Sequence, residues 1–273
     1  LTRRLMPASV PLRPLLPVAV SMATLLLAGV AAFTHLLSRP RAFSTPWRVA
    51  LAQLAAANPW RGKDLLMLAL VLSAAQAARS LLGGALAWDM LAFQGALIAG
   101  ILWRARGKMR PFGAAAPAGA LAAQAALRWL AILPALWFAS FVWNLLLNAA
   151  GHAPDFQEAI RLFLANDDPW TRAGFVFFAV ILAPFAEEAL FRGILLPMLV
   201  RRIGSVAGRA LTAIGFAALH ADLGTFPALA LFSVALSLAY ARTGTLWVPV
   251  GMHALFNAAN LVLLLALARA GLV

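Results

Sequence analysis

Long apolar runs separated by short polar stretches divide most of the chain. Several runs are long enough to cross a hydrocarbon core of about 30 Å, because an α-helix rises about 1.5 Å per residue. These runs are residues 15–37, 65–83, 85–103, 129–149, 173–200 and 247–268. Two shorter runs, 210–221 and 227–241, flank a turn that contains Asp222 and Gly224. The pattern predicts an all-α, polytopic membrane protein with about eight membrane helices.

The composition supports this fold class. Hydrophobic residues make up 63% of the 273 residues and charged residues only 11%, which is more apolar surface than one soluble core of this length can bury. The chain has no cysteine, which excludes disulfides, thiolate zinc sites and cysteine nucleophiles. Any chemistry must therefore use oxygen and imidazole groups.

The net charge of +13 is distributed in a way that indicates membrane orientation and not nucleic-acid binding. If the helices alternate in direction, four basic loops lie on one side of the membrane and the acidic segment 151–172 lies on the other. The positive-inside rule then places the basic loops in the cytoplasm. The expected location of the protein is a plasma (inner) membrane. Residues 44–62 and 112–127 are predicted to lie as helices on the cytoplasmic surface. The basic residues are Arg39, Arg41, Arg48, Arg61, Lys63, Arg104, Arg106, Lys108, Arg110, Arg201, Arg202, Arg209 and Arg242.

The N-terminal arginines do not fit this scheme, because the alternation places the N-terminus outside. Arg3, Arg4 and Arg13 precede the first apolar run. A translation start at Met6 would remove two of these arginines. We state that start as a hypothesis, which an N-terminal mass determination would test.

Two adjacent carboxylates, Glu187 and Glu188, interrupt the apolar run 173–200. An acidic residue near the centre of a membrane helix costs about 2.5–3.5 kcal/mol, so each glutamate needs a partner or a function. Positions four apart share a helix face, so Glu188 can reach Arg192, whereas Glu187 points elsewhere. A structural ion pair is the favoured interpretation for Glu188 and Arg192, and it leaves Glu187 free.

Three further polar residues lie in or beside the apolar segments that follow. These are His220, together with His253 and Asn257, which project from one helix face a single turn apart. A histidine alone in an apolar helix most often makes an interhelical hydrogen bond, and this is our interpretation of His35 and His152. For the three residues taken together with Glu187, a shared polar pocket is the better prediction.

The residue types in this predicted pocket are suited to amide hydrolysis. A buried carboxylate with a nearby imidazole can position and deprotonate a water molecule. Donors on the other side of the substrate can stabilise the developing oxyanion. A proton-coupled transporter would use the same buried Glu and His residues as a proton relay, and it stays open as an alternative.

Three short motifs follow one another on successive membrane segments. They are Glu187-Glu188-x-x-x-Arg192-Gly193, Phe216-x-x-x-His220 and His253-x-x-x-Asn257. In this order, and with the flanking segment Gly244-Thr-Leu-Trp-Val-Pro249, they resemble the motifs of the CAAX-prenyl-protease and bacteriocin-processing family of intramembrane proteases. The resemblance covers about residues 130–268.

The resemblance implies a helical membrane fold around a polar intramembrane cavity that opens to the cytoplasmic side and to lipid. Residues 1–128 would supply N-terminal membrane helices and surface segments, and residues 129–273 would form the catalytic membrane domain. The implied activity is that of an intramembrane endopeptidase that hydrolyses a peptide bond of a membrane-associated or lipidated substrate. By motif, the general base would be Glu187, its partner on the water His220, the oxyanion contacts His253 and Asn257, and the supporting pair Glu188 and Arg192.

The family has also been described as metallopeptidases. Glu187, His220 and His253 would make a His2Glu zinc site with one open position. The chain lacks the His-Glu-x-x-His motif of zincins, and a zinc site would leave Asn257 without a clear role, so hydrolysis without a cofactor is favoured. A non-catalytic membrane scaffold or bacteriocin-immunity protein is the main alternative to an enzyme. The expected partners are a peptide or protein substrate and membrane lipid.

Overall fold

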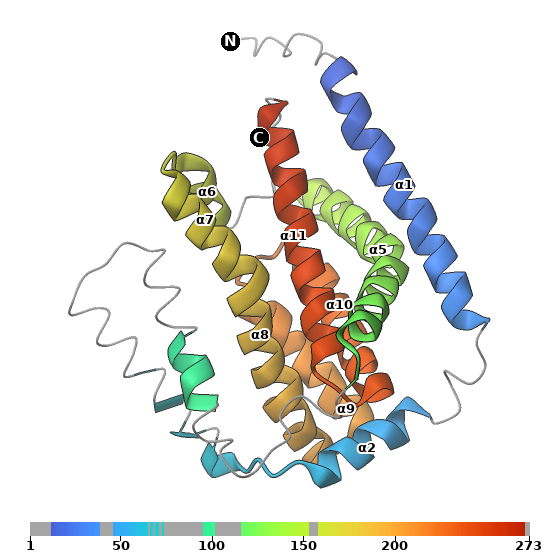
Figure 1. Ribbon diagram of the computed structural model, residues 1–273, viewed down its shortest axis with the longest axis vertical. Coiled ribbons are helices and arrows are strands. Elements are labelled where there is room, and N and C mark those ends of the chain that lie inside the picture. The colour runs from blue at the N-terminus through green and yellow to red at the C-terminus, as the bar shows by residue number, and fades with distance from the viewer. Residues whose placement is uncertain are drawn as a thin grey trace.

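Helices account for all of the regular structure that is described. The computed structural model describes residues 12–38, 46–64, 95–101, 116–152 and 158–270, with a few further positions between 66 and 73. Within these residues there is no strand, and five helical segments are long and apolar enough to cross a membrane (Figure 1). The all-α, integral membrane fold class is therefore confirmed. The predicted count of about eight helices is not confirmed, because most of 65–83 and most of 85–103 lie outside the described residues.

Among the described residues, the first two long helices lie side by side. α1 (Leu12–Leu37) matches the predicted run, whereas α5 (Ala118–Ala149) begins well before the predicted residue 129. Residues 118–127 are therefore the first turns of α5 and not a separate surface helix. The physical reason is that Pro117 precedes an alanine-rich stretch of high helix propensity in which no proline interrupts the helix before Pro134. The predicted domain boundary after residue 128 falls inside α5.

A continuous helical rod carries the glutamate pair. After the short helix α6 (Glu158–Ala165), the rod starts at Pro169. Proline suits the first position of a helix because a backbone N–H there would have no acceptor within the helix, so its absence costs no hydrogen bond. The carboxylate of Asp168 caps this start by accepting the Thr171 N–H at 2.7 Å. The rod consists of α7 (Pro169–Phe177), the π-helical segment η2 (Phe178–Leu182), α8 (Ala183–Glu188), the π-helical segment η3 (Ala189–Leu195) and the start of α9 (Leu196–Leu219).

The chain reverses direction within α9, at Gly204. The backbone there has φ +82° and ψ 167°, a conformation that essentially only glycine adopts. A Cβ atom on Gly208 would lie 2.7 Å from the backbone nitrogen of Val200, although eight residues of straight helix would separate them by about 12 Å. The candidate span 169–219 is therefore a helical hairpin. The shorter run predicted at 210–221 lies in its second arm.

The last two helices pack with α5 around a common core. α10 (Phe226–Thr243) and α11 (Trp247–Arg269) agree closely with the predicted runs, and Gly244, at φ +66°, ends α10 in the left-handed conformation. α11 also contacts η2 and α8, so its polar face meets the glutamate rod. The shared core consists of Ala125, Leu136, Phe232, Leu236, Ala239, Val248 and Met252.

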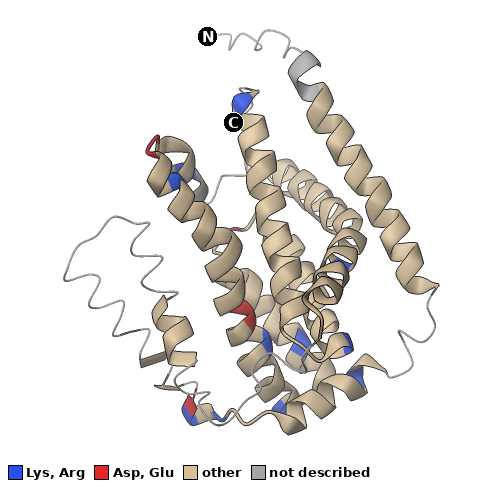
Figure 2. Cartoon of the chain, in the orientation of Figure 1, with Lys and Arg blue, Asp and Glu red and all other residues tan. Residues whose placement is uncertain are grey.

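Basic residues gather at one end of the bundle. α2 (Trp47–Ala57), inside the predicted surface segment 44–62, lies across this end against α9 and α10. Figure 2 shows most of the described Lys and Arg residues near α2, whereas Asp167 and Asp168, between α6 and α7, lie at the opposite end. This separation agrees with the charge pattern from the sequence, although the basic segment 104–110 lies outside the described residues. Large apolar side chains such as Phe138 and Val262 are exposed on the flanks, as expected of a surface in contact with lipid.

Candidate active site

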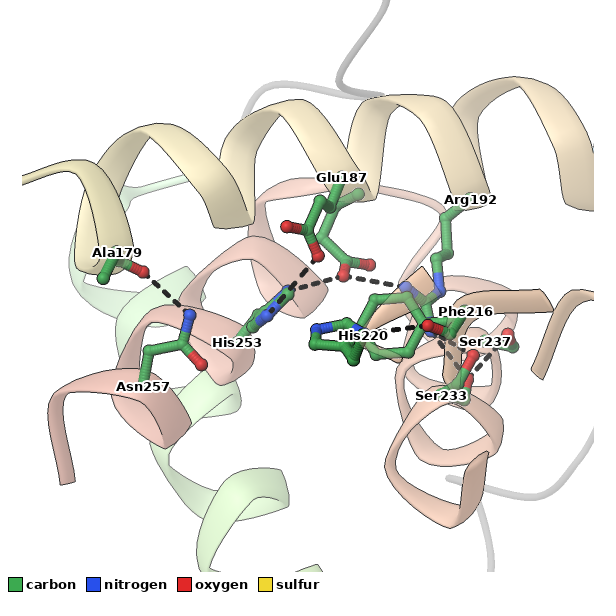
Figure 3. A network of polar contacts seen from close by, with 10 residues as sticks. Ala179, Glu187, Arg192, Phe216, His220, Ser233, Ser237, His253 and Asn257 are labelled. Atoms are coloured by element: carbon green, nitrogen blue, oxygen red, sulfur yellow. Dashed lines mark hydrogen bonds and ion pairs between the residues drawn. The ribbon is translucent and has the colours of Figure 1, made fainter. Parts of the chain in front are cut away.

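Glu188 is the centre of a buried polar network. Its Oε1 atom accepts hydrogen bonds from Nη1 of Arg192 at 2.8 Å and from Nδ1 of His253 at 2.9 Å (Figure 3). The side chains of Glu188 and Arg192 are fully buried. The pairing of Glu188 with Arg192 is the contact that their spacing of four residues predicts. Because the carboxylate can only accept, Nδ1 of His253 carries a proton.

Arg192 is held from the other side by α10. Its Nη2 atom donates to the carbonyl oxygen of Ser233 at 3.0 Å and to the hydroxyl oxygen of Ser233 at 2.6 Å. The Ser233 carbonyl also accepts from the hydroxyl of Ser237 at 2.9 Å. The guanidinium carbon lies 4.8 Å from the centre of the Phe216 ring, within the range of a cation–π contact. Ser233 was not among the predicted site residues, since a serine in an apolar helix carries no distinctive local signal.

Glu187 has a different environment from its neighbour. Its side chain is 21% exposed, and its Oε2 atom is buried without a hydrogen-bond partner. Nε2 of His253 lies 4.0 Å from this atom, which is too long for a direct hydrogen bond. The Oε2 atom of Glu188 is likewise buried without a hydrogen-bond partner. The two carboxylates differ in that Glu188 makes two ion-pair contacts through Oε1 and is fully buried, whereas the Glu187 side chain is partly exposed.

His220 is oriented by its own helix. It lies at the C-terminal end of α9, where its Nδ1 atom is 2.9 Å from the carbonyl oxygen of Phe216. A carbonyl only accepts, so Nδ1 carries the proton in this contact and Nε2 of the neutral ring keeps a lone pair. The Phe216 ring packs against both imidazoles, with ring centres 5.0 Å from His220 and 5.6 Å from His253 (Figure 3). His220 thus joins the site through Phe216.

The turn after His220 is firmly held. Ala221 has a positive φ of 49°, which is uncommon for a residue with a side chain. The carboxylate of Asp222 accepts the N–H of Gly224 at 2.8 Å, and the indole N–H of Trp143 in α5 donates to the carbonyl oxygen of Leu223 at 2.7 Å. These contacts fix the position at which α9 ends, and with it the position of the His220 ring.

Asn257 and His253 do not share a hydrogen-bond partner. The amide Nδ2 of Asn257 donates to the carbonyl oxygen of Ala179 at 2.8 Å, whereas His253 contacts the glutamates. Ala179 lies in η2, and π-helical segments are frequent at functional sites. The expectation that the two side chains grip one oxygen therefore remains a prediction. The second amide N–H of Asn257 is the donor left for that role.

The residues of the zinc alternative do not gather into a metal site. Among the described residues, no group of three His, Asp or Glu side chains could hold a metal ion. His253 directs Nδ1 to Glu188, and His220 directs Nδ1 to a backbone carbonyl. Glu187, His220 and His253 in this arrangement thus do not fit a three-ligand zinc site. Hydrolysis without a cofactor stays a prediction.

The comparisons with known proteins agree with the motifs. A family model described as "Type II CAAX prenyl endopeptidase Rce1-like" matches residues 169–259. This segment extends from the start of α7 into α11 and includes all six predicted site residues. The resemblance to CAAX proteases is thereby confirmed, and the match supports an endopeptidase of this class. No curated protein and no solved structure matches the chain.

Proposed function

We propose that the protein is an intramembrane endopeptidase that hydrolyses a peptide bond of a membrane-associated or lipidated protein, with water as the nucleophile. The observation that carries this proposal is the difference between the two adjacent glutamates. Glu188 is fully buried and its Oε1 atom is paired with Arg192 and His253, while the Glu187 side chain is 21% exposed and its Oε2 atom lies 4.0 Å from Nε2 of His253 without a hydrogen bond. Glu187 is therefore the carboxylate of the two that a water molecule can reach, as a general base requires.

Glu187 is the general base in this proposal, and His220 assists it. The carboxylate of Glu187 removes a proton from a water molecule, and the lone pair on Nε2 of His220 orients the same water. The hydroxide oxygen bonds to the carbonyl carbon of the substrate, and the electrons of the C=O bond move to the oxygen. When the C–N bond breaks, the proton held by Glu187 passes to the leaving nitrogen.

His253 and Asn257 stabilise the negative oxygen of the tetrahedral intermediate. Nδ1 of His253 is directed to the Glu188 carboxylate, so Nε2 is the ring nitrogen left to contact the substrate oxygen, to which it donates when the ring carries both protons. Arg192 and Ser233 hold Glu188, so they set the orientation of the imidazole from behind. Loss of one oxyanion donor typically costs about 10²–10³ in rate.

The substrate approaches from the cytoplasmic face of the plasma (inner) membrane. This part of the proposal rests on the basic end of the bundle and on the positive-inside rule. The description of the matching family indicates a prenylated C-terminal segment as one substrate class to be tested. Membrane lipid is the other expected partner.

The test is cleavage of a fluorogenic peptide library, with farnesylated members, by the purified protein in liposomes. Glu187→Gln keeps the shape of the side chain but removes the base, and we expect it to abolish cleavage. Asp167→Asn is the matched control, because the Asp167 side chain is 99% exposed and lies at the other end of the bundle. Equal activity of wild type and Glu187→Gln would refute the proposal, as would a folded wild type that cleaves no member.

A further inference from the structure

The segment Asn58–Trp60, which follows α2, contacts the helical rod that carries the glutamates. The Asn58 side chain is buried, and its Nδ2 atom donates to the carbonyl oxygen of Gly193 at 2.7 Å. Its Oδ1 atom accepts the backbone N–H of Trp60 at 3.0 Å. One side chain thus connects a local turn to a helix 135 residues further along the chain.

Gly193 lies in the π-helical segment η3, directly after the glutamates. Where hydrogen bonding changes from α-helical to π-helical, a backbone carbonyl loses the N–H group that it would accept from in a regular α-helix. If that carbonyl is buried, another donor must replace the lost N–H group. Asn58 supplies that donor at η3, and Asn257 makes the equivalent contact to Ala179 in η2. Each π-helical segment beside the glutamates therefore accepts a hydrogen bond from one asparagine amide.

Neighbouring contacts hold the same segment in place. Trp60 is only 3% exposed and belongs to one apolar cluster with Ala186 and Ala189, the residues directly before and after the glutamate pair. Arg201, about two turns beyond Gly193, donates to the carbonyl oxygens of Ala55 at 2.9 Å and Asn58 at 2.5 Å, and also to that of Trp60. Asn58 is therefore itself firmly oriented against the rod.

We propose that Asn58 is a positioning residue for Glu187: by holding the Gly193 carbonyl, it sets the rotation of the helical turn that presents the catalytic carboxylate. This role rests on the proposed function. Asn58 lies outside residues 169–259, so the matching family model does not include it. It also lies outside the three motifs on which the sequence analysis relied.

A kinetic experiment tests the role in the full-length protein in liposomes. Asn58→Ser keeps an oxygen that can accept the Trp60 N–H but is too short to reach Gly193. We expect kcat to fall about tenfold or more, because a shift of 1 Å in a catalytic group can cost as much as about 10² in rate. KM should stay within about twofold of wild type, since Asn58 does not contact the substrate.

The matched control is Leu136→Ala, in the shared core of α5, α10 and α11. This variant leaves a cavity and lowers stability in a core cluster that contains no residue of the glutamate rod. If kcat per folded molecule falls equally in both variants, Asn58 has a merely structural role and the proposal is overturned. An effect of Asn58→Ser confined to KM overturns it as well.

Hydrogen exchange measured by mass spectrometry separates failure of this inference from failure of the proposed function. In Asn58→Ser, peptides that cover residues 183–195 should exchange faster, while peptides from residues 247–259 should be unchanged. No change at 183–195 would overturn the Asn58 contact itself. A wild type without Glu187-dependent cleavage would overturn both the proposed function and the positioning role, whatever the exchange result.

Discussion

Removal of the positive charge at Arg192 should destabilise the protein strongly. Arg192→Met keeps most of the side-chain volume but leaves the fully buried Glu188 with His253 as its remaining partner. Breaking a buried ion pair by removing one partner costs about 3–5 kcal/mol, because an uncompensated charge stays in a region of low dielectric constant. Ser233→Ala keeps the pair and removes one hydrogen bond to a charged group, so it should cost about 1.5–3 kcal/mol.

The double variant Arg192→Met with Glu188→Gln tests this reasoning. With both charges gone, the cost should be smaller than that of Arg192→Met alone, and the interaction energy should be about 2 kcal/mol. The free energy of unfolding is measured by denaturant titration in detergent micelles, followed by the fluorescence of the nine tryptophans. A loss below about 1 kcal/mol for Arg192→Met, or strict additivity in the cycle, would show that the buried pair does not stabilise this site.

Three other outcomes follow from the structure. A strong chelator should leave peptide cleavage within about twofold of the untreated rate, and loss of cleavage that added zinc restores would refute the metal-free proposal. Gly204→Ala should cost about 1–3 kcal/mol in the same unfolding assay because of the positive φ at the hairpin bend. The control Gly119→Ala, at an open helical position, should be neutral or stabilising. Equal effects of the two variants would contradict the reversal of the chain at Gly204. Hydrogen bonds from the Thr171 hydroxyl and N–H lower the pKa of Asp168 below its ordinary value of 3.8. The ionised carboxylate therefore stabilises the folded protein at the start of α7. This stabilisation is fully present above pH 3.8 and is lost as the pH falls through the lower pKa of the folded protein. The thermal midpoint of wild type should then fall more steeply in acid than that of Asp168→Ala, and parallel pH curves would exclude this contribution.

Local spacing explains which parts of the site were predictable. Glu188 and Arg192 lie four residues apart on one helix, so their contact follows from the helical repeat alone. The same argument placed His253 and Asn257 together, yet they contact different partners, the glutamates and the Ala179 carbonyl. Residues on one helix face are still a full turn apart along the axis, about 5.4 Å, and the neighbouring helix decides what each of them meets.

Long-range contacts explain what could not be predicted. The contact of His253 with Glu188 joins positions 65 residues apart, and those of Ser233 and Asn58 span 41 and 135 residues. No local pattern distinguishes Ser233 or Asn58 from other polar residues in apolar surroundings. The π-helical segments were also missed, because an apolar run of this composition suits either type of helical turn.

The sequence by itself determined the helical, membrane-embedded class of this protein, the positions of α1, α10 and α11, and the identity of the polar residues that the membrane makes costly. These features depend on composition and on a helical repeat that the covalent chain carries locally. Only the tertiary structure decided that His253 and Ser233 join the Glu188–Arg192 pair, that Asn257 bonds to the Ala179 carbonyl, and that Asn58 reaches Gly193. These features depend on which helix faces meet, and helix packing brings together residues whose distance along the chain carries no information about their contact.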